Sequence, residues 1–528
     1  MSTSPAEPQT LGVDGLPHDD RLDRRVLLVA GVVVLGSIMS ILDMTVVGVA
    51  QNTFMSTWDT TPATAAWTIT GYTLALAAVI PATGWAADRF GTKRLYLTAV
   101  ALFTIGSLLC AVAWSIESLI AFRVLQGLGG GMLMPLGMTI LTKAAGPERI
   151  GRVMAVLGIP MLLGPILGPI LGGWLIEIAS WHWIFLINLP IGIGAIIYAA
   201  LVLPKDTEHP SESFDLLGFA LLSPGLALFL YGVSSIPEEG SFTASGVIVP
   251  VVIGAILQMA FVWHALRKDH PLIDLRLFKN LNLTVAILTL VVFAVAFFGS
   301  MLLYAQYFIG VRGETTLMAG LLLAPQGIGA MVTMPIAGAL TDKKGPGWFV
   351  LSGIVLILLG MAPFTQVTPD TSYLLLCGAL FVQGLGMGMT MMPVMTAALR
   401  TLQEHEVARG STLTNITQQV AASIGTAVVS VVLTNALKEN PLSSFAIGMT
   451  VDPERTAAMA NQSGQPLPPD PTAVEAMVSQ GLTSAADAFG HSWMVSLVLV
   501  VFALVPAFFL PRSRSEENER SHEPVLMH

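Results

Sequence analysis

The sequence predicts an all-α polytopic membrane protein with about fourteen spanning helices. Only 11% of its 528 residues are charged, 54% are hydrophobic, and the mean hydropathy is +0.73. Since a soluble domain typically has about a quarter of its residues charged, these charges cannot cover a water-soluble particle of this size. The apolar residues also form long blocks, and the two halves of the chain repeat the same motifs. We therefore expect lipid to be the solvent.

Each apolar block has the length of a bilayer-spanning helix, and polar breaks with Pro or Gly separate the blocks. The predicted spans are 26–50, 62–86, 95–114, 117–143, 150–176, 182–203, 214–235, 244–266, 281–309, 316–340, 347–367, 371–399, 408–436 and 486–510. The segment 437–485, rich in Pro, Ser, Gln and Ala, is predicted to be a long extracytoplasmic loop before the last span.

The distribution of Lys and Arg indicates how these spans are oriented in the membrane. An even number of spans puts both termini on one side, where 21 of the 25 basic residues then fall; three fall on the other side and Arg123 lies inside a span. Cytoplasmic loops carry the excess of Lys and Arg, so we expect a multi-pass cell-membrane protein with both termini cytoplasmic. The net charge of −9 and the acidic tails leave no basic surface for nucleic acid.

A repeat at matched spacing divides the chain. Gly84, Asp88, Arg89 and Gly91, followed by Lys93 and Arg94, are echoed after the tenth span by Gly338, Asp342, Lys343 and Gly345. Gln126-Gly127-Leu128-Gly129 is likewise echoed by Gln383-Gly384-Leu385-Gly386. Matched spacing favours a state-dependent latch at these two loops over ordinary positive-inside loops.

Two six-helix halves joined by an extra helix pair explain this repeat, as in transporters built from parallel repeats. The expected domains are a cytoplasmic tail (1–25), an N-terminal half (26–203), two linker helices with a cytoplasmic loop (204–280), a C-terminal half (281–510) and a second cytoplasmic tail (511–528).

Two charged residues lie well inside spans, away from the span ends. Asp43 must face a cavity, pair with a base or bind a proton, because a bare carboxylate is costly in hydrocarbon. Arg123 is always charged and needs a counter-charge, which Asp43 or Glu117 could supply. A proton-coupling pair and a purely structural ion pair both fit these residues. Other polar or aromatic groups within spans are candidates for a substrate cavity: Trp67, Tyr72, Gln126, Asn415 and Gln418.

These motifs resemble the major facilitator superfamily, and specifically its branch of fourteen-span drug:proton antiporters. The loop at 84–94 matches the superfamily's Gly-x-x-x-Asp-Arg-x-Gly-x-Lys-Arg pattern, and Leu42-Asp43-Met44-Thr45-Val46-Val47 matches the branch's first-span pattern. Arg123, Gln126 and Gly127 match the fourth-span pattern. The fifth span carries the antiporter-type motif as Gly158, Gly164, Pro165, Gly168, Pro169, Gly172 and Gly173. Gln418 departs from the pattern, since an Arg is common there.

The resemblance implies a major facilitator fold, proton coupling through Asp43 and Arg123, and a rocking contact at the glycines of the fifth span, which would also limit proton leak. It favours a proton-driven antiporter for amphipathic or cationic small molecules, a multidrug exporter. A dedicated exporter of an endogenous lipid, siderophore or antibiotic is the alternative, and nutrient symport is third. We expect no enzymatic activity, cofactor or metal. Small molecules, protons and the bilayer are the expected partners, and a periplasmic adaptor protein stays an open question.

Overall fold

The computed structural model describes residues 23–146, 149–206, 213–236, 243–403, 406–462, 468 and 470–512, and within these ranges the secondary structure is helical, without strands. Thirteen helices there are long and apolar enough to cross a membrane. The 29-residue helix α6 (Ile150–Ile178) lies outside that count, and some of its side chains are not described. The fold class expected from the sequence is confirmed.

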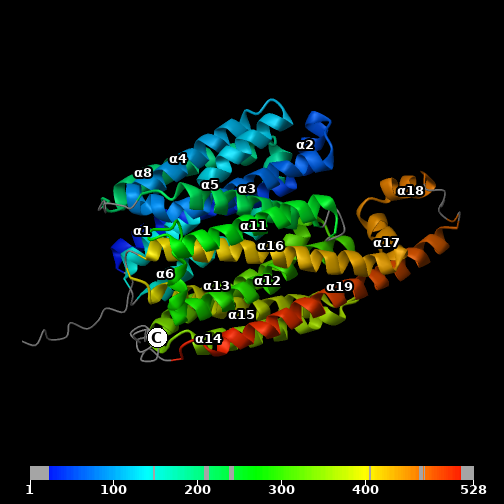
Figure 1. The fold of residues 1–528 in the computed structure, drawn as a ribbon. Coiled ribbons are helices and arrows are strands. Elements are labelled where there is room, and N and C mark those ends of the chain that lie inside the picture. Colours follow the sequence, from blue (N-terminus) through cyan, green and yellow to red (C-terminus); the bar gives the residue numbers. More distant parts are fainter. Residues whose placement is uncertain are drawn as a thin grey trace, which may run out of the picture.

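The first group of helices packs mainly within itself (Figure 1). It comprises α1 (Arg24–Val49), α2 (Gln51–Trp58), α3 (Pro62–Phe90), α4 (Thr92–Ala111), α5 (Ile116–Ala145), α6, α7 (Trp183–Leu186) and α8 (Asn188–Val202). The second group does likewise and comprises α12 (Leu281–Gly310), α13 (Thr316–Lys344), α14 (Gly347–Met361), the 3-10 helix η2 (Ala362–Gln366), α15 (Tyr373–Arg400), α16 (Val407–Glu439), α17 (Pro441–Val451), α18 (Pro453–Gln462) and α19 (Pro471–Phe508). The division into two six-helix halves stays a prediction that this packing supports.

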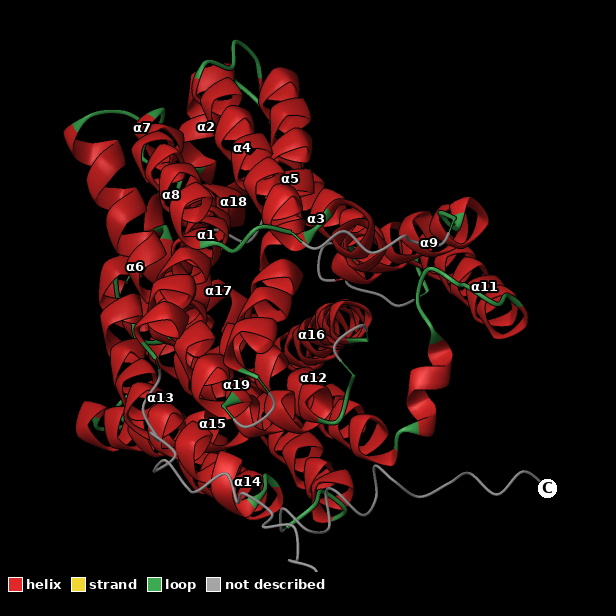
Figure 2. Ribbon diagram, turned by 90° about the vertical axis from the view of Figure 1, so that its left-hand side faces the viewer, coloured by secondary structure: helices red, strands yellow, loops and turns green. Residues whose placement is uncertain are grey.

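Two helices, α9 (Leu216–Ser234) and α11 (Ser245–Arg267), form a linker pair that lies outside the bundle (Figure 2). The pair packs beside α3 and α16 through α9. The 3-10 helix η1 (Leu275–Lys279) follows the pair in the chain. Asp215, the N-cap of α9, holds the pair together. Its carboxylate accepts hydrogen bonds from the backbone N–H of Gly218 (3.0 Å) and of Leu272 (3.1 Å) and from Lys268 Nζ (2.9 Å), and His264 Nε2 lies 2.9 Å away.

The segment predicted as a loop, 437–485, is largely helical: α17, α18 and the first turns of α19 fall within it. Three of its prolines, Pro441, Pro453 and Pro471, are the first residues of helices. Pro441 and Pro471 occupy first-turn positions, where a missing N–H costs nothing. Asn440 and Asp470 precede them and cap the helices by accepting hydrogen bonds from the backbone N–H of Leu442 and Thr472. The last span therefore continues a helix that starts well before residue 486.

The two groups meet closely at the end of the bundle that carries Asp88 and Asp342, which we call the basic end because Arg152, Arg400 and Arg409 also lie there. A Cβ atom on Gly151 would lie 2.5 Å from the carbonyl oxygen of Gly338. Such small-residue contacts let membrane helices approach closely, so α6 and α13 pack backbone to backbone at this end.

We expect Gly338→Ala to lower the midpoint of thermal unfolding in detergent. Its methyl group would lie 2.4 Å from the carbonyl oxygen of Gly151, and relieving such a clash typically costs about 1–3 kcal/mol. Gly320→Ala, in the same helix, is the matched control, because its methyl group would have no atom within 4 Å. Equal midpoints for the two variants would contradict the close contact.

Asp215 should make stability pH-dependent at the acidic end of the scale. Burial acts to raise the pKa of its carboxyl group, but hydrogen bonds from Lys268, Gly218, His264 and Leu272 outweigh burial and lower the pKa to about 2. A lowered pKa gives stability that is complete above the usual value of 3.8 and is lost as the pH falls through about 2.

We therefore expect Asp215→Asn to be less stable than the wild type by about 1–2 kcal/mol at neutral pH, with a difference that shrinks as the pH falls from 4 toward 2. Thermal unfolding followed across this range measures it. Asp269→Asn, on the exposed surface of the same segment, is the control. A difference that is constant down to pH 2 would show that the Asp215 carboxylate is not the source.

Candidate functional site

Asp43 and Arg123 form an ion pair in the interior of the first group of helices. Arg123 Nη1 in α5 donates to Asp43 Oδ2 in α1, and both side chains are completely shielded from solvent. Gln126 bridges them, because its Oε1 accepts from Arg123 Nη1 at 2.7 Å while its Nε2 donates to Asp43 Oδ1 at 2.8 Å. Glu117, the other counter-charge that the sequence allowed, is exposed. We call Asp43, Arg123 and Gln126 the charge network.

A second set of residues, which sequence reasoning missed, holds the charge network in place. Asn188 at the start of α8 donates to Asp43 Oδ1 at 3.1 Å and to Ser107 Oγ at 3.0 Å. The backbone carbonyl of Thr68 in α3 accepts from Arg123 Nε at 2.9 Å. A lone Asn in an otherwise apolar span is the signal that could have identified Asn188, because a buried amide needs partners.

Arg123 is also packed against an aromatic ring. Its guanidinium carbon lies 4.2 Å from the centroid of the Tyr72 ring, within the range of a cation–π contact. Tyr72 is fully buried, and its hydroxyl lies 3.0 Å from Ser40 Oγ. Arg123 Nη2 is buried without a hydrogen-bond partner in the described part of the chain. The network therefore keeps one donor unsatisfied.

Local sequence explains why α5 can carry a charge so deeply. Arg123 and Gln126 are three residues apart and so share one face of the helix. The next turn is rich in Gly: a Cβ atom on Gly127 would lie 2.4 Å from the Tyr72 carbonyl oxygen, and one on Gly129 would lie 2.5 Å from the Phe103 backbone nitrogen. These glycines bring α3 and α4 against α5, so neighbouring helices supply the polar partners that lipid cannot.

The structure places the other predicted cavity residues in different surroundings. Trp67 is 40% exposed and stacks on Tyr231 of α9 with a centroid distance of 5.5 Å, at the linker pair. Asn415 in α16 donates to Met138 Sδ in α5 at 3.0 Å, across the interface between the two groups. Gln418 is half-buried in α16. Thus Tyr72 and Gln126 join the charge network, whereas Trp67, Asn415 and Gln418 lie elsewhere.

The glycines predicted as an antiporter motif join α6 to the helix that carries Asp43. A Cβ atom on Gly164 would lie 2.1 Å from Ile41 Cγ2, and one on Gly168 would lie 1.9 Å from Thr45 Oγ1. Gly172 faces Val46 in the same way, and Thr45 Oγ1 donates to the Gly164 carbonyl at 3.1 Å.

At its other end α6 faces the second group, where a Cβ atom on Gly158 would lie 2.2 Å from Met334 Sδ of α13; no atom lies within 4 Å of the Cβ position of Gly173. The side chains of Pro165 and Pro169 lie outside the described residues. α6 thus touches both α1 and the second group of helices.

The two acids of the predicted latch each contact the opposite group of helices. Asp88 Oδ2, in α3, lies 3.8 Å from Arg409 Nε in α16. Asp342 Oδ1, in α13, accepts from the backbone N–H of Gly151 in α6 at 2.9 Å. Gly91 and Gly345, which occupy equivalent positions in the repeat, share a backbone conformation with φ of 86° and 82°. Glycine adopts this conformation readily.

The remaining latch residues differ in their contacts. Lys93 Nζ donates to the carbonyl oxygens of Ala200 and Leu203, at 2.7 Å each, and so belongs to the first group alone. Gly84 packs on Ala408 and Thr412 of α16. Arg89, Arg94 and Lys343 are exposed. The sequence repeat thus corresponds to a structural repeat of an acid and two glycines, and the basic residues do not share one role.

We expect a double-mutant cycle to show strong coupling within the charge network. Asp43→Asn leaves Arg123 as a buried unpaired cation, which typically costs about 3–5 kcal/mol, whereas Asp43→Asn combined with Arg123→Gln should recover most of that loss. The midpoint of thermal unfolding in detergent measures each variant. Penalties that simply add would show that the two side chains do not depend on each other.

Comparisons with known proteins agree with this architecture. Residues 33–426 match the family model described as Major Facilitator Superfamily. A protein named "Multidrug resistance protein B homolog" from Mycobacterium tuberculosis (strain ATCC 25618 / H37Rv) is 48% identical over 507 residues, which covers 95% of this chain and 93% of that protein. "Multidrug export protein EmrB" from Haemophilus influenzae is 31% identical over 398 residues, which covers 75% of this chain and 78% of that protein.

Solved structures share the fold at low sequence identity. The human organic anion transporter MFSD10 superposes with a TM-score of 0.58 at 14% identity, covering 91% of this chain and 100% of that chain. The proton:xylose symporter XylE bound to 6-bromo-6-deoxy-D-glucose gives a TM-score of 0.53 at 13% identity, with coverages of 94% and 98%. With a family model matched over most of its length and a close relative along nearly all of it, this chain belongs to the major facilitator superfamily.

Proposed function

We propose that this protein is a proton-coupled antiporter that exports amphipathic or cationic small molecules, including drugs, by alternating access. The observation that carries the proposal is the buried charge network of Asp43, Arg123 and Gln126. Ionisable residues within membrane spans are costly and generally mark ion or substrate pathways. Relatives named for multidrug resistance and multidrug export support the same class of function.

The charge network can exchange a proton for a cation. Ionised Asp43 balances Arg123 and accepts hydrogen bonds from Gln126 and Asn188. Protonation removes the charge that Arg123 needs, so Arg123 must find other acceptors and the surrounding helices must adjust. A cationic substrate favours the ionised carboxylate, whereas a proton favours the neutral one. Because the two compete for one group, each shifts the protein toward the state that expels the other.

The helix contacts offer a route from Asp43 to the interface between the helix groups. Gly164, Gly168 and Gly172 of α6 pack on α1 within a turn of Asp43, and Gly158 of the same helix contacts Met334 of α13. A shift of α1 on protonation would therefore move α6 against the second group. Small-residue contacts suit such movement, because few side chains interlock across them.

The latch would hold one end shut. We assign this role to Gly84, Asp88 and Asp342, whose contacts join α3 to α16 and α13 to α6. Gly91 would supply the turn between α3 and α4, and Arg89, Lys93, Arg94 and Lys343 would be the basic flanks. We place this basic end, and with it both termini, on the cytoplasmic side, since Lys and Arg are in excess in cytoplasmic loops. The described conformation is then closed toward the cytoplasm.

Substrate contacts would come from both groups of helices. Tyr72 lies beside Arg123 in the first group, while Asn415 and Gln418 would contribute from α16 in the second. Aromatic and amide side chains of this kind hold amphipathic cations without demanding one shape. The proposed role is transport of small molecules in the membrane, with no chemical change to the substrate.

The test is transport by purified protein in liposomes. We impose a pH gradient and follow a fluorescent lipophilic cation, comparing the wild type with Asp43→Asn and with Asp59→Asn. Asp59 is an exposed carboxylate with a φ of 47°, which Asn tolerates as well. We expect gradient-driven transport by the wild type and Asp59→Asn, and loss of at least about nine-tenths of it in Asp43→Asn, because one proton-carrying group is removed.

Intact gradient-driven transport in Asp43→Asn would make Asp43 structural and refute its proposed role. A folded wild-type protein that moves no lipophilic cation would refute multidrug export and direct the search to endogenous lipids, siderophores or antibiotics as substrates.

A further inference from the structure

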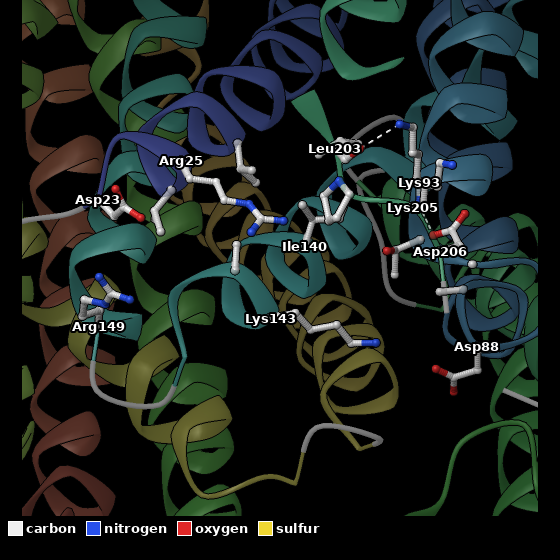
Figure 3. A pocket seen from close by; sticks show the side chains of 17 residues that line it. Asp23, Arg25, Asp88, Lys93, Ile140, Lys143, Arg149, Leu203, Lys205 and Asp206 are labelled. Carbon is white, nitrogen blue, oxygen red and sulfur yellow. Dashed lines mark hydrogen bonds between the residues drawn. The ribbon is translucent and has the colours of Figure 1, made fainter. Parts of the chain in front are cut away.

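A cavity of about 460 Å³ opens at the basic end, within the first group of helices (Figure 3). Its walls are the start of α1, the end of α3 with the start of α4, the end of α5, the N-cap of α6 and the segment that follows α8. Its described lining residues all fall between Asp23 and Asp206. Its shape therefore does not depend on how the second group is placed, and it is separate from the charge network.

Among the residues that the structure describes, five basic side chains line this cavity and three acidic ones do. Two of the three carboxylates are already engaged. Asp206 accepts hydrogen bonds from the backbone N–H groups of Lys93 (2.8 Å) and Arg94 (3.0 Å) and so caps α4. Asp88 lies 3.8 Å from Arg409 of the second group. Asp23, at the start of α1, is the third, so one carboxylate without these contacts remains beside the five bases.

Most of the basic side chains, by contrast, form no ion pair with an acid in the described part of the chain. Within the described ranges the side chains of Arg25, Lys143 and Lys205 have no hydrogen bond or ion pair. The side chain of Arg149 has one hydrogen bond there, from Nε to the carbonyl oxygen of Ala145. Arg25 comes from α1 and Lys143 from α5, and both side chains extend into the cavity in Figure 3. Lys93 alone is satisfied, by two carbonyl oxygens.

Basic residues at a membrane surface usually point outward into water, each on its own. Here four cations from separate segments of the chain line one concave site: Arg25, Lys143 and Lys205 are exposed to solvent there, and Arg149 is half-buried. Lys binds phosphate as a point charge, while the planar guanidinium of Arg can hold two phosphate oxygens at once. These four side chains therefore offer a phosphate group donors from different segments of the chain.

We propose that this cavity binds a phosphate group, through Arg25, Lys143, Arg149 and Lys205. The phosphate group belongs either to an anionic phospholipid of the adjacent leaflet or to a soluble phosphate ester. Binding joins the ends of α1 and α5 to the segment after α8. The site persists while the two groups of helices move, since its residues all lie in one group.

The test uses the full chain purified in detergent and two probes. Native mass spectrometry compares retention of phosphatidylglycerol with that of phosphatidylcholine. Thermal unfolding with and without inorganic pyrophosphate tests the soluble anion. The variant is Arg25→Gln/Lys143→Gln. The control is Arg24→Gln/Lys279→Gln, which removes the same charges from exposed positions outside the cavity. A second variant, Arg25→Lys/Lys143→Arg, keeps both charges.

A lipid source predicts that the wild type, the control and the charge-keeping variant retain phosphatidylglycerol, and that Arg25→Gln/Lys143→Gln binds it about tenfold more weakly or worse, with phosphatidylcholine unchanged. A soluble source predicts the same ranking for stabilisation by pyrophosphate, with no lipid preference. Equal behaviour of Arg25→Gln/Lys143→Gln and the control, or no response to either anion in the wild type, would overturn the proposal.

Discussion

The ion pair between Asp43 and Arg123 is the constraint on which the rest of the first helix group depends. Hydrocarbon cannot solvate either charge, and each alone would be strongly destabilising. The protein meets this cost by surrounding the pair with four groups from α3, α5 and α8: Gln126, Asn188, the Thr68 carbonyl and the Tyr72 ring. The helices α1, α3, α5 and α8 are thereby fixed relative to one another around a polar centre.

Glycine residues allow these helices to come close enough to supply hydrogen-bond partners to the ion pair. The Gly127–Gly131 turn seats α3 and α4 on α5, and Gly164 and Gly168 seat α6 on α1. The same device recurs at the basic end, where Gly151 and Gly338 join the two groups of helices. A chain of close, smooth contacts thus runs from the buried charges to the interface that must open and close in an alternating-access transporter.

Much of the fold can be predicted from the sequence, because hydropathy, basic loops and repeated motifs are local signals. The segment 437–485 is the exception, since its Pro-rich composition predicts a loop and the structure shows helices. Asn440 before Pro441 and Asp470 before Pro471 are helix starts, and a capping residue followed by Pro is a recognisable signal.

The sequence identifies only part of the candidate site. Asp43 and Arg123 stand out because charges are rare in apolar spans, but the choice between Asp43 and Glu117 as the partner of Arg123 requires the tertiary structure. Asn188 meets Ser107, and Asp215 meets Lys268, from positions far apart in the chain, so no spacing reveals these contacts. Trp67 stacks on Tyr231 of the linker pair, a position that only the packing of α9 decides.

The central claim, that a proton and a substrate compete for Asp43, is tested most directly by counting protons at binding. Isothermal titration of the purified protein with a lipophilic cation, repeated in two buffers of different ionisation enthalpy, measures the protons released per cation bound. Competition for Asp43 predicts proton release by the wild type that increases as the pH is lowered, because the cation must then displace a bound proton, and no release by Asp43→Asn. Equal release by the two proteins would contradict it, because the exchanged proton would then come from another group.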